Sequence, residues 1–224
     1  MPSSPPLSFS QFDLLHLWTQ GDAVTQTTVL ILAAMSVTTW YVVVVREIVL
    51  LRLLRQGRAA ETAVTGNAAP NAILSALTSG GPFHDLAQTG LAALERHREG
   101  LSGTIDRNSW LSLSLSRAVG RVTARLGDGL PQLATIASTA PFVGLFGTVW
   151  SIHHALTEIG VSGQASIERV AGPVGESLVM TALGLAVAVP AVLAHNWLVR
   201  RQKSAIEMVR GFGTDLHALL LEQS

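Results

Sequence analysis

A single acidic residue, Glu176, directly precedes the stretch from Ser177 to Val199, which contains no charged side chain. A carboxyl group at the edge of an apolar segment can take up and release protons, because partial withdrawal from water favours its neutral form. The alternative is structural. Glu176 follows Gly172-Pro173, and an acid in the first turn of a helix is stabilised by the helix dipole. Spacing alone leaves both interpretations open.

Hydroxyl side chains are the other polar groups within the apolar parts of the chain. Where water is excluded, a hydroxyl must find a partner in the protein or line a cavity. It commonly donates to the carbonyl one turn back on its own helix, so a lone threonine is usually structural. Spacing alone therefore assigns none of these hydroxyls a function. The set includes Thr135, Ser138, Thr139, Thr148, Ser151, Ser177 and Thr181.

Several constellations that enzymes and metal sites need are missing. The chain has no cysteine, which excludes disulfides and thiolate ligands, and it has no G-x-x-x-x-G-K-S/T phosphate loop. His195 is too far along the same predicted helix to act as a base for Ser177, and His154 with Glu158 supplies only two metal ligands. Fifteen basic and fifteen acidic residues cancel, so the net charge favours no nucleic-acid partner. We therefore expect no enzyme, no metal and no cofactor.

The composition is that of a membrane protein. Of 224 residues, 13% are charged, about half the share in soluble globular domains, and the mean hydropathy is +0.40. Three stretches contain no charged residue: 23–45, 129–157 and 177–199. Each exceeds the roughly 20 residues that a helix needs to cross the hydrocarbon core of a bilayer. The sequence therefore predicts an all-α integral membrane protein with three transmembrane helices.

Basic residues are distributed unevenly around these stretches. None precedes Asp22, ten arginines lie between Arg46 and Asp128, one lies at Arg169, and four basic residues follow Val199. Because basic loops remain in the cytoplasm, we expect the N-terminus outside and the C-terminus in the cytoplasm. The predicted segments are an outer N-terminal arm (1–23), a first span (24–45), a cytoplasmic helical loop (46–129), a second span (130–157), a short outer link (158–175), a third span (176–199) and a cytoplasmic tail (200–224).

The long loop between the first two spans is predicted to be helical. Residues 46–58 continue the first span as a charged helix, and apolar residues between 83 and 98 recur with a helical period. Glycine and proline predict breaks at 66–70 and 79–82. A further helix is expected to run from about residue 104 into the second span, with Pro131 as a kink or a boundary.

Small residues form a stripe along each of the second and third spans. Their spacing of three and four places them on one helix face, where small side chains allow two backbones to approach closely. We therefore expect these spans to contact other helices, either each other or those of neighbouring subunits. The stripes are Ala137, Ala140, Gly144, Gly147 and Ser151 in the second span, and Ser177, Thr181, Gly184, Ala188, Ala191 and His195 in the third.

Two blocks of sequence resemble a known family. The first reads APFVGLFGTVWSI over 140–152, and the second reads AGPVGESLVMTALGLAVAVPA over 171–191, followed by His195-Asn196. Through both blocks the chain is similar to the MotA/TolQ/ExbB proton-channel family, and within that family to its ExbB members. The order of spans and loops extends the resemblance to the whole chain.

The resemblance implies a ring of five subunits in the inner membrane of a Gram-negative bacterium. The second and third spans would line a central pore, the first span would face the lipids, and two copies of the single-span protein ExbD would occupy the pore. The complex would use the proton gradient to drive TonB, and so energise the import of ferric siderophores, haem and cobalamin. No cofactor is implied.

The resemblance also assigns roles to single residues. Glu176 matches the family's pore glutamate, which implies a role in proton coupling. Thr148 and Thr181 match hydroxyls that face an aspartate of the partner inside the pore. Pro141 and Pro190 match helix prolines, which shape the spans rather than carry protons.

This chain differs from the family pattern at several positions. These differences leave Thr148, Glu176 and Thr181 unchanged, so they affect the identification of the partner protein more than that of the mechanism. Residues 170–176 read VAGPVGE where ExbB and TolQ commonly read VAPGIAE, and His195 replaces the usual tyrosine. Two alternatives to an ExbB-type subunit are therefore kept. One is a TolQ-type subunit of the Tol-Pal envelope system, and the other is a membrane scaffold that orders its partners without moving protons.

Overall fold

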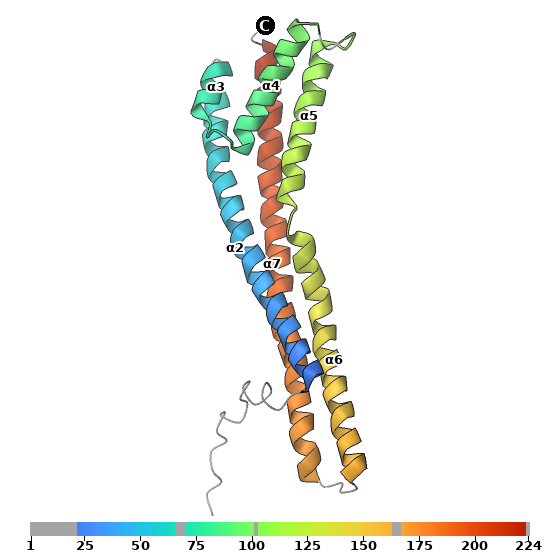
Figure 1. Ribbon diagram of the computed structural model, residues 1–224. Coiled ribbons are helices and arrows are strands. Elements are labelled where there is room, and N and C mark those ends of the chain that lie inside the picture. The colour runs from blue at the N-terminus through green and yellow to red at the C-terminus, as the bar shows by residue number, and fades with distance from the viewer. Residues whose placement is uncertain (1–21, 66–69, 101–102, 163–166, 223–224) are drawn as a thin grey trace, which may run out of the picture. The chain divides into compact units, whose positions relative to one another are not determined.

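The computed structural model describes residues 22–65, 70–100, 103–162 and 167–222, and these residues form helices joined by short turns (Figure 1). No strand occurs in these ranges. Three helical segments, Ala23–Val64, Arg107–Val161 and Ser177–Glu222, are long and apolar enough to cross a membrane. The prediction of an all-α integral membrane protein is therefore confirmed. The helices are α2 (Ala23–Thr65), α3 (Pro70–Ala76), α4 (Pro82–Arg98), α5 (Arg107–Leu126), α6 (Leu130–Ser162) and α7 (Ile167–Glu222).

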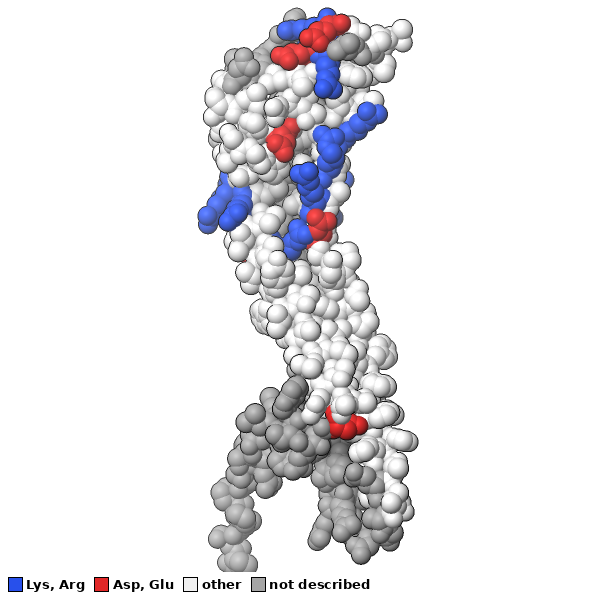
Figure 2. Space-filling model, in the orientation of Figure 1, with Lys and Arg blue, Asp and Glu red and all other residues white. Residues whose placement is uncertain are grey.

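The chain divides into two compact units, whose boundaries fall within α2, α6 and α7. The first unit comprises Met1–Tyr41 and Gln132–Ala194, and the second comprises Val42–Pro131 and His195–Ser224. On the face shown in Figure 2, charged side chains gather over α4 and α5, whereas most of α6 is covered by uncharged atoms. The charge-free stretch 130–157 of α6 is long enough to lie across a bilayer.

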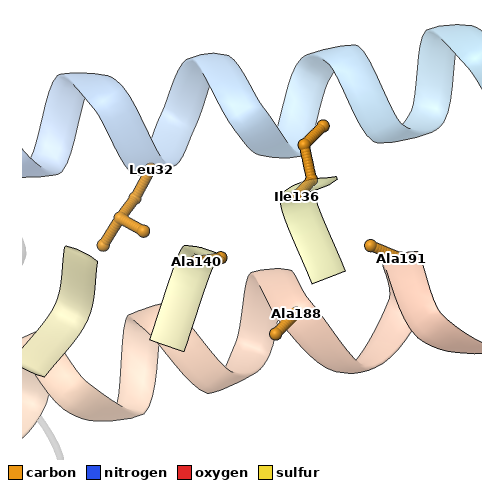
Figure 3. Close-up of a cluster of buried hydrophobic side chains, with 5 residues drawn as sticks. All are labelled: Leu32, Ile136, Ala140, Ala188 and Ala191. Atoms are coloured by element: carbon orange, nitrogen blue, oxygen red, sulfur yellow. The ribbon is translucent and has the colours of Figure 1, made fainter. Parts of the chain in front are cut away.

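In the first unit, α2, α6 and α7 meet around a small apolar core (Figure 3). Leu32 of α2 packs with Ile136 and Ala140 of α6 and with Ala188 and Ala191 of α7. Four of these five residues belong to α6 and α7, and three of those four are alanines, so these two backbones lie close together. The second and third spans were expected to contact other helices, and the structure shows that they contact each other.

One face of α2 is also buried, and it carries threonines. Thr25, Thr28 and Thr39 are buried, whereas Val37 and Tyr41 are among the most exposed large side chains. The hydroxyls of Thr28 and Thr39 donate to the carbonyls of Val24 and Met35, one turn back. Because these hydroxyls are satisfied within α2, the buried face presents methyl groups to its neighbours.

The second unit packs α4 and α5 against the C-terminal part of α7. The rings of Phe83 on α4 and Phe212 on α7 pack nearly perpendicular to each other, with 5.3 Å between ring centres. Asp106 caps α5 by accepting a hydrogen bond from the backbone N–H of Ser109, and the guanidinium of Arg107 donates to the carbonyl of Leu220. A cation is favourable at that place, because the last carbonyls of a helix have no partner within it.

The helices predicted between 46 and 129 are confirmed where the structure describes them. α2 continues through 46–58, α4 covers 83–98, and the chain turns between α3 and α4 at 79–82. The break predicted at 66–70 falls mainly on 66–69, which lie outside the described residues. At the junction of α5 and α6, Gly129 has a φ of 83°, which glycine adopts without strain. Pro131 follows that junction at the second position of α6, so the boundary is confirmed and there is no kink in a continuous helix.

The start of α7 differs from one interpretation of the sequence. The helix begins at Ile167, so residue 176 lies in its third turn and not its first. Gly172-Pro173 is therefore inside the helix, and the interpretation of Glu176 as a first-turn acid is wrong. Proline is tolerated within membrane helices, because neighbouring groups can satisfy the freed carbonyl.

Candidate functional site

The structure brings together two of the predicted site residues, Thr148 on α6 and Thr181 on α7. Their hydroxyl oxygens are 2.6 Å apart. The side chain of Thr148 is buried between the two helices, with 8% of its surface exposed, and Thr181 is partly exposed. Hydroxyls between two membrane helices are expected to be hydrogen-bonded, and this pair joins α6 directly to α7.

The carbonyl contacts of Thr148 favour one direction of donation within the pair. Thr148 Oγ1 also lies 2.8 Å from the carbonyl oxygen of Ser177 and 3.2 Å from that of Gly144. A threonine hydroxyl has one proton to donate and two lone pairs. When Thr148 donates to the Ser177 carbonyl, which is the shorter bond, Thr181 must donate to Thr148. Thr181 then presents lone pairs toward its exposed side and can accept a hydrogen bond there.

Glycines set the distance between the helices at this level. A Cβ atom on Gly184 would lie 2.8 Å from the carbonyl oxygen of Ala140 and 3.0 Å from the Cα of Gly144. A Cβ on Gly144 would likewise lie 2.7 Å from the carbonyl oxygen of Met180. The two backbones are therefore in direct contact one turn from the Thr148–Thr181 pair, which lets the short threonine side chains reach each other.

Glu176 lies on α7 immediately before Ser177, whose carbonyl accepts the Thr148 hydroxyl. The side chain of Glu176 lies outside the part of the chain that the structure describes. Its backbone position places it within one residue of the hydroxyl network. The role of Glu176, and those of Thr148 and Thr181, stay predictions.

The two predicted helix prolines lie inside the helices that form the site. Pro141 is within α6, next to Ala140, whose carbonyl contacts Gly184. Pro190 is within α7, next to the core residue Ala191. Each proline removes one N–H from its helix and leaves the carbonyl four residues earlier without that donor. Their role in shaping the helices stays a prediction.

One polar contact near the site was not predicted from the sequence. The indole Nε1–H of Trp150 on α6 donates to Asp22 at 2.6 Å, and the backbone N–H of Thr25 donates to the other carboxylate oxygen at 2.9 Å. Burial raises the pKa of Asp22, but these hydrogen bonds, together with nearby His154, bring that pKa below its ordinary value of 3.8. The sequence signal available was an acid three residues before Thr25 at the start of an apolar helix, which is typical of a helix cap.

Histidines lie at both ends of the candidate spans. The ring of His153 is 6.2 Å from that of Trp150, and Nδ1 of His195 lies 3.1 Å from the carbonyl oxygen of Leu130. In the described ranges, no three side chains of the metal-binding types gather at one place. The hydroxyl network between α6 and α7 is the polar arrangement that joins these two helices at the level of Thr148.

The segment that contains these residues matches a known protein family. The model of the MotA/TolQ/ExbB proton channel family matches residues 83–210, a range that includes Thr148, Glu176 and Thr181. The chain is 38% identical to the biopolymer transport protein ExbB of Neisseria meningitidis serogroup B over 216 residues, which is 94% of this chain and 98% of the relative.

Two further relatives show how far the similarity extends. The biopolymer transport protein ExbB of Xanthomonas campestris pv. campestris is 38% identical over 233 residues, covering 96% of this chain and 91% of the relative. The Tol-Pal system protein TolQ of Haemophilus influenzae is 30% identical over 220 residues, covering 93% and 95%. The similarity to the ExbB proteins spans nearly the full length of both chains. The chain therefore belongs to the MotA/TolQ/ExbB proton channel family, within which it is most similar to ExbB.

Proposed function

We propose that this chain is an ExbB-type subunit of an inner-membrane proton channel, which uses the proton motive force to energise TonB-dependent import across the outer membrane. The observation that carries the proposal is the Thr148–Thr181 hydroxyl pair, whose carbonyl partner, Ser177, directly follows Glu176 in the chain. All of these residues lie inside the segment that matches the proton channel family. The identity to ExbB proteins along nearly the whole chain supports the ExbB type over the TolQ type.

In this proposal the chain works as part of a membrane assembly. Five copies form a ring with the N-terminus in the periplasm and the C-terminus in the cytoplasm, and α6 and α7 line its pore. Two copies of ExbD occupy the pore, TonB receives the mechanical work, and lipids cover the outside. The imported substrates are ferric siderophores, haem and cobalamin. The distribution of arginines along the sequence supports the orientation.

The hydroxyl pair offers a specific place for a proton donor. Thr181 presents lone pairs when Thr148 donates to the Ser177 carbonyl, so it accepts a hydrogen bond from a protonated carboxyl group or from a water molecule. The aspartate of ExbD provides such a group in its neutral form. Glu176 provides a second titratable group on the same helix, and an acid near an apolar segment exchanges protons with the water that reaches it.

Complementation tests the proposed function. The chain is expressed with its cognate ExbD in a strain that lacks ExbB, and growth is measured with a ferric siderophore as the only iron source. Growth supports the proposal. Failure to grow, at normal membrane levels and with ExbD co-purifying, contradicts the ExbB type. Detergent resistance restored to a strain without TolQ would then assign the chain to the Tol-Pal system.

Replacing Thr148 by valine is expected to lower the rate of siderophore uptake by about fivefold or more, because a hydrogen bond of this kind is worth roughly 1 kcal/mol and its loss also releases Thr181. Valine keeps the shape of threonine and removes the hydroxyl. Serine keeps the hydroxyl, so Thr148→Ser should retain most of the uptake. The measurement is the initial rate of labelled siderophore uptake at matched membrane levels. Equal rates in the valine and serine variants would exclude a role for the hydroxyl.

A further inference from the structure

We infer that Asp22 is a positioning residue for α6: through Trp150, its carboxylate holds α6 in the position that sets Thr148 against α7. The contacts that carry this inference lie within the first unit and do not involve the side chain of Glu176. The effect on transport rests on the proposed function, whereas the effect on the position of α6 does not.

The carboxylate is itself fixed in place at the start of α2. Asp22 directly precedes the helix, and its Oδ1 accepts the backbone N–H of Thr25 at 2.9 Å, which satisfies one of the N–H groups that a helix start leaves free. Its Oδ2 accepts the indole N–H of Trp150 at 2.6 Å. Each oxygen therefore has its own donor, and a hydrogen bond to an ionised acceptor is about twice as strong as a neutral one.

This contact and the hydroxyl pair hold α6 from two sides. Trp150 and Thr148 are two positions apart, so they point about 200° apart around the helix axis. Thr148 bonds to α7, and Trp150 bonds to the residue that caps α2. A rotation or an axial shift of α6 would lengthen the bonds of Thr148 and the bond of Trp150 together. The position of Thr148 against α7 therefore depends on the contact between Trp150 and Asp22.

The packing between these two contacts leaves little freedom for α6. A Cβ atom on Gly147 would lie 2.7 Å from Cε of Met180 on α7 and 3.1 Å from the methyl of Thr28 on α2. Both neighbouring helices therefore approach α6 within one turn of Thr148. Close packing resists separation of the helices but permits sliding, which the directional hydrogen bond to Asp22 opposes.

The charge state of Asp22 favours this role. Its pKa is lowered by the hydrogen bonds of Trp150 and Thr25 despite the opposing effect of burial, so the carboxylate is ionised at neutral pH. His154 is a nearby group whose charge affects it, and His153 lies beside the Trp150 ring. A group with a lowered pKa contributes stability at neutral pH and loses it as the pH falls through that pKa.

The test uses the absence of cysteine from this chain. Thr148 and Thr181 are both replaced by cysteine in the full chain, and the rate of disulfide formation between them is measured in intact membranes with copper phenanthroline. Mass spectrometry separates bonds within one chain from bonds between chains. The background chain is compared with Asp22→Asn, Trp150→Phe and the double variant. Thr27→Val is the matched control, because Thr27 lies near the start of α2 and its hydroxyl donates to the carbonyl of Ala23 on its own helix.

The inference expects a slower disulfide reaction, by about threefold or more, in both Asp22→Asn and Trp150→Phe. Because the two residues act through one bond, the double variant should react no more slowly than either single variant. Rates equal to those of Thr27→Val would overturn the inference. So would a double variant whose slowing is the product of the two single effects.

A spectroscopic measurement checks the contact itself. With Trp150 as the sole tryptophan, Asp22→Asn should shift the emission of its indole, and Thr27→Val should not. An unshifted emission would overturn the inference. Neither measurement requires proton transport, so a failure of the proposed function leaves their outcome unchanged. If both the inference and the proposed function hold, Asp22→Asn also lowers siderophore uptake.

Discussion

Glutamine in place of Glu176 is expected to abolish proton-driven uptake while leaving the protein in the membrane. Glutamine has nearly the size of glutamate and keeps hydrogen-bonding groups, but it cannot take up or release a proton. Removal of a group that transfers protons commonly lowers a rate by about 100-fold or more. The position in the third turn of α7 means that no first-turn dipole effect is lost. The measurement is the initial rate of ferric siderophore uptake with cognate ExbD.

Two further variants make this result specific. Glu176→Asp keeps an ionisable carboxyl group one methylene shorter, so it should retain part of the uptake. Glu207→Gln removes an exposed acid elsewhere on the same helix and should leave the rate unchanged. Full uptake in Glu176→Gln at matched membrane levels would reduce Glu176 to a structural acid. Loss of ExbD from the purified complex, rather than loss of coupling, would support the scaffold alternative.

The second large effect is expected at the contact between the α6 and α7 backbones. In Gly184→Val, the new side chain would meet the Ala140 carbonyl and the Cα of Gly144, both of which are backbone atoms within about 3 Å of the Cβ position. Neither can move aside without separating the helices. Overpacking of this kind costs about 1–3 kcal/mol, and separation would also lengthen the Thr148–Thr181 bond. We expect a lower midpoint of thermal unfolding, by about 5 °C or more, together with loss of uptake.

Gly211 supplies the matched control on the same helix. A Cβ there would meet no atom within 4 Å, so Gly211→Ala should leave the unfolding midpoint unchanged or raise it, since alanine is the better helix former. The midpoint is measured by tryptophan fluorescence on the full chain in detergent. A Gly184→Val protein as stable as the wild type would contradict the close approach of the two backbones.

The sequence was most informative where one physical rule dominated. Charge-free stretches longer than a bilayer core predict membrane helices, and the three candidate spans confirm them. The stripes of small residues predicted that α6 and α7 contact other helices, and the contact of Gly144 with Gly184 shows that they meet each other. The start of α7 was not predictable from Gly172-Pro173. Glycine and proline usually interrupt a helix in water, but a membrane helix tolerates them where neighbouring groups satisfy the freed backbone carbonyls.

Fewer of the contacts in the candidate site could be predicted from the sequence. Thr148 and Thr181 entered through a family resemblance, and only the three-dimensional pairing shows that their hydroxyls bond to each other. The contact between Asp22 and Trp150 joins residues far apart in the chain, and no periodicity relates them. Other hydroxyls, such as that of Thr139, donate to their own helix one turn back, as expected for a lone threonine. Cross-helix partners are the part that a pattern along one chain cannot specify.

The self-satisfied threonines of α2 have a consequence for the synthesis of the protein. Gly144 and Gly184 are about 40 residues apart in the chain, so α6 and α7 can pair soon after both have been synthesised. The partners of Leu32 in the core are more than 100 residues later, so bringing them together closes a longer loop and costs more conformational entropy. During that delay the face of α2 that carries Thr28 and Thr39 is exposed to lipid. Because both hydroxyls already donate to their own helix, α2 can remain in the bilayer as a stable single helix until the α6–α7 hairpin arrives.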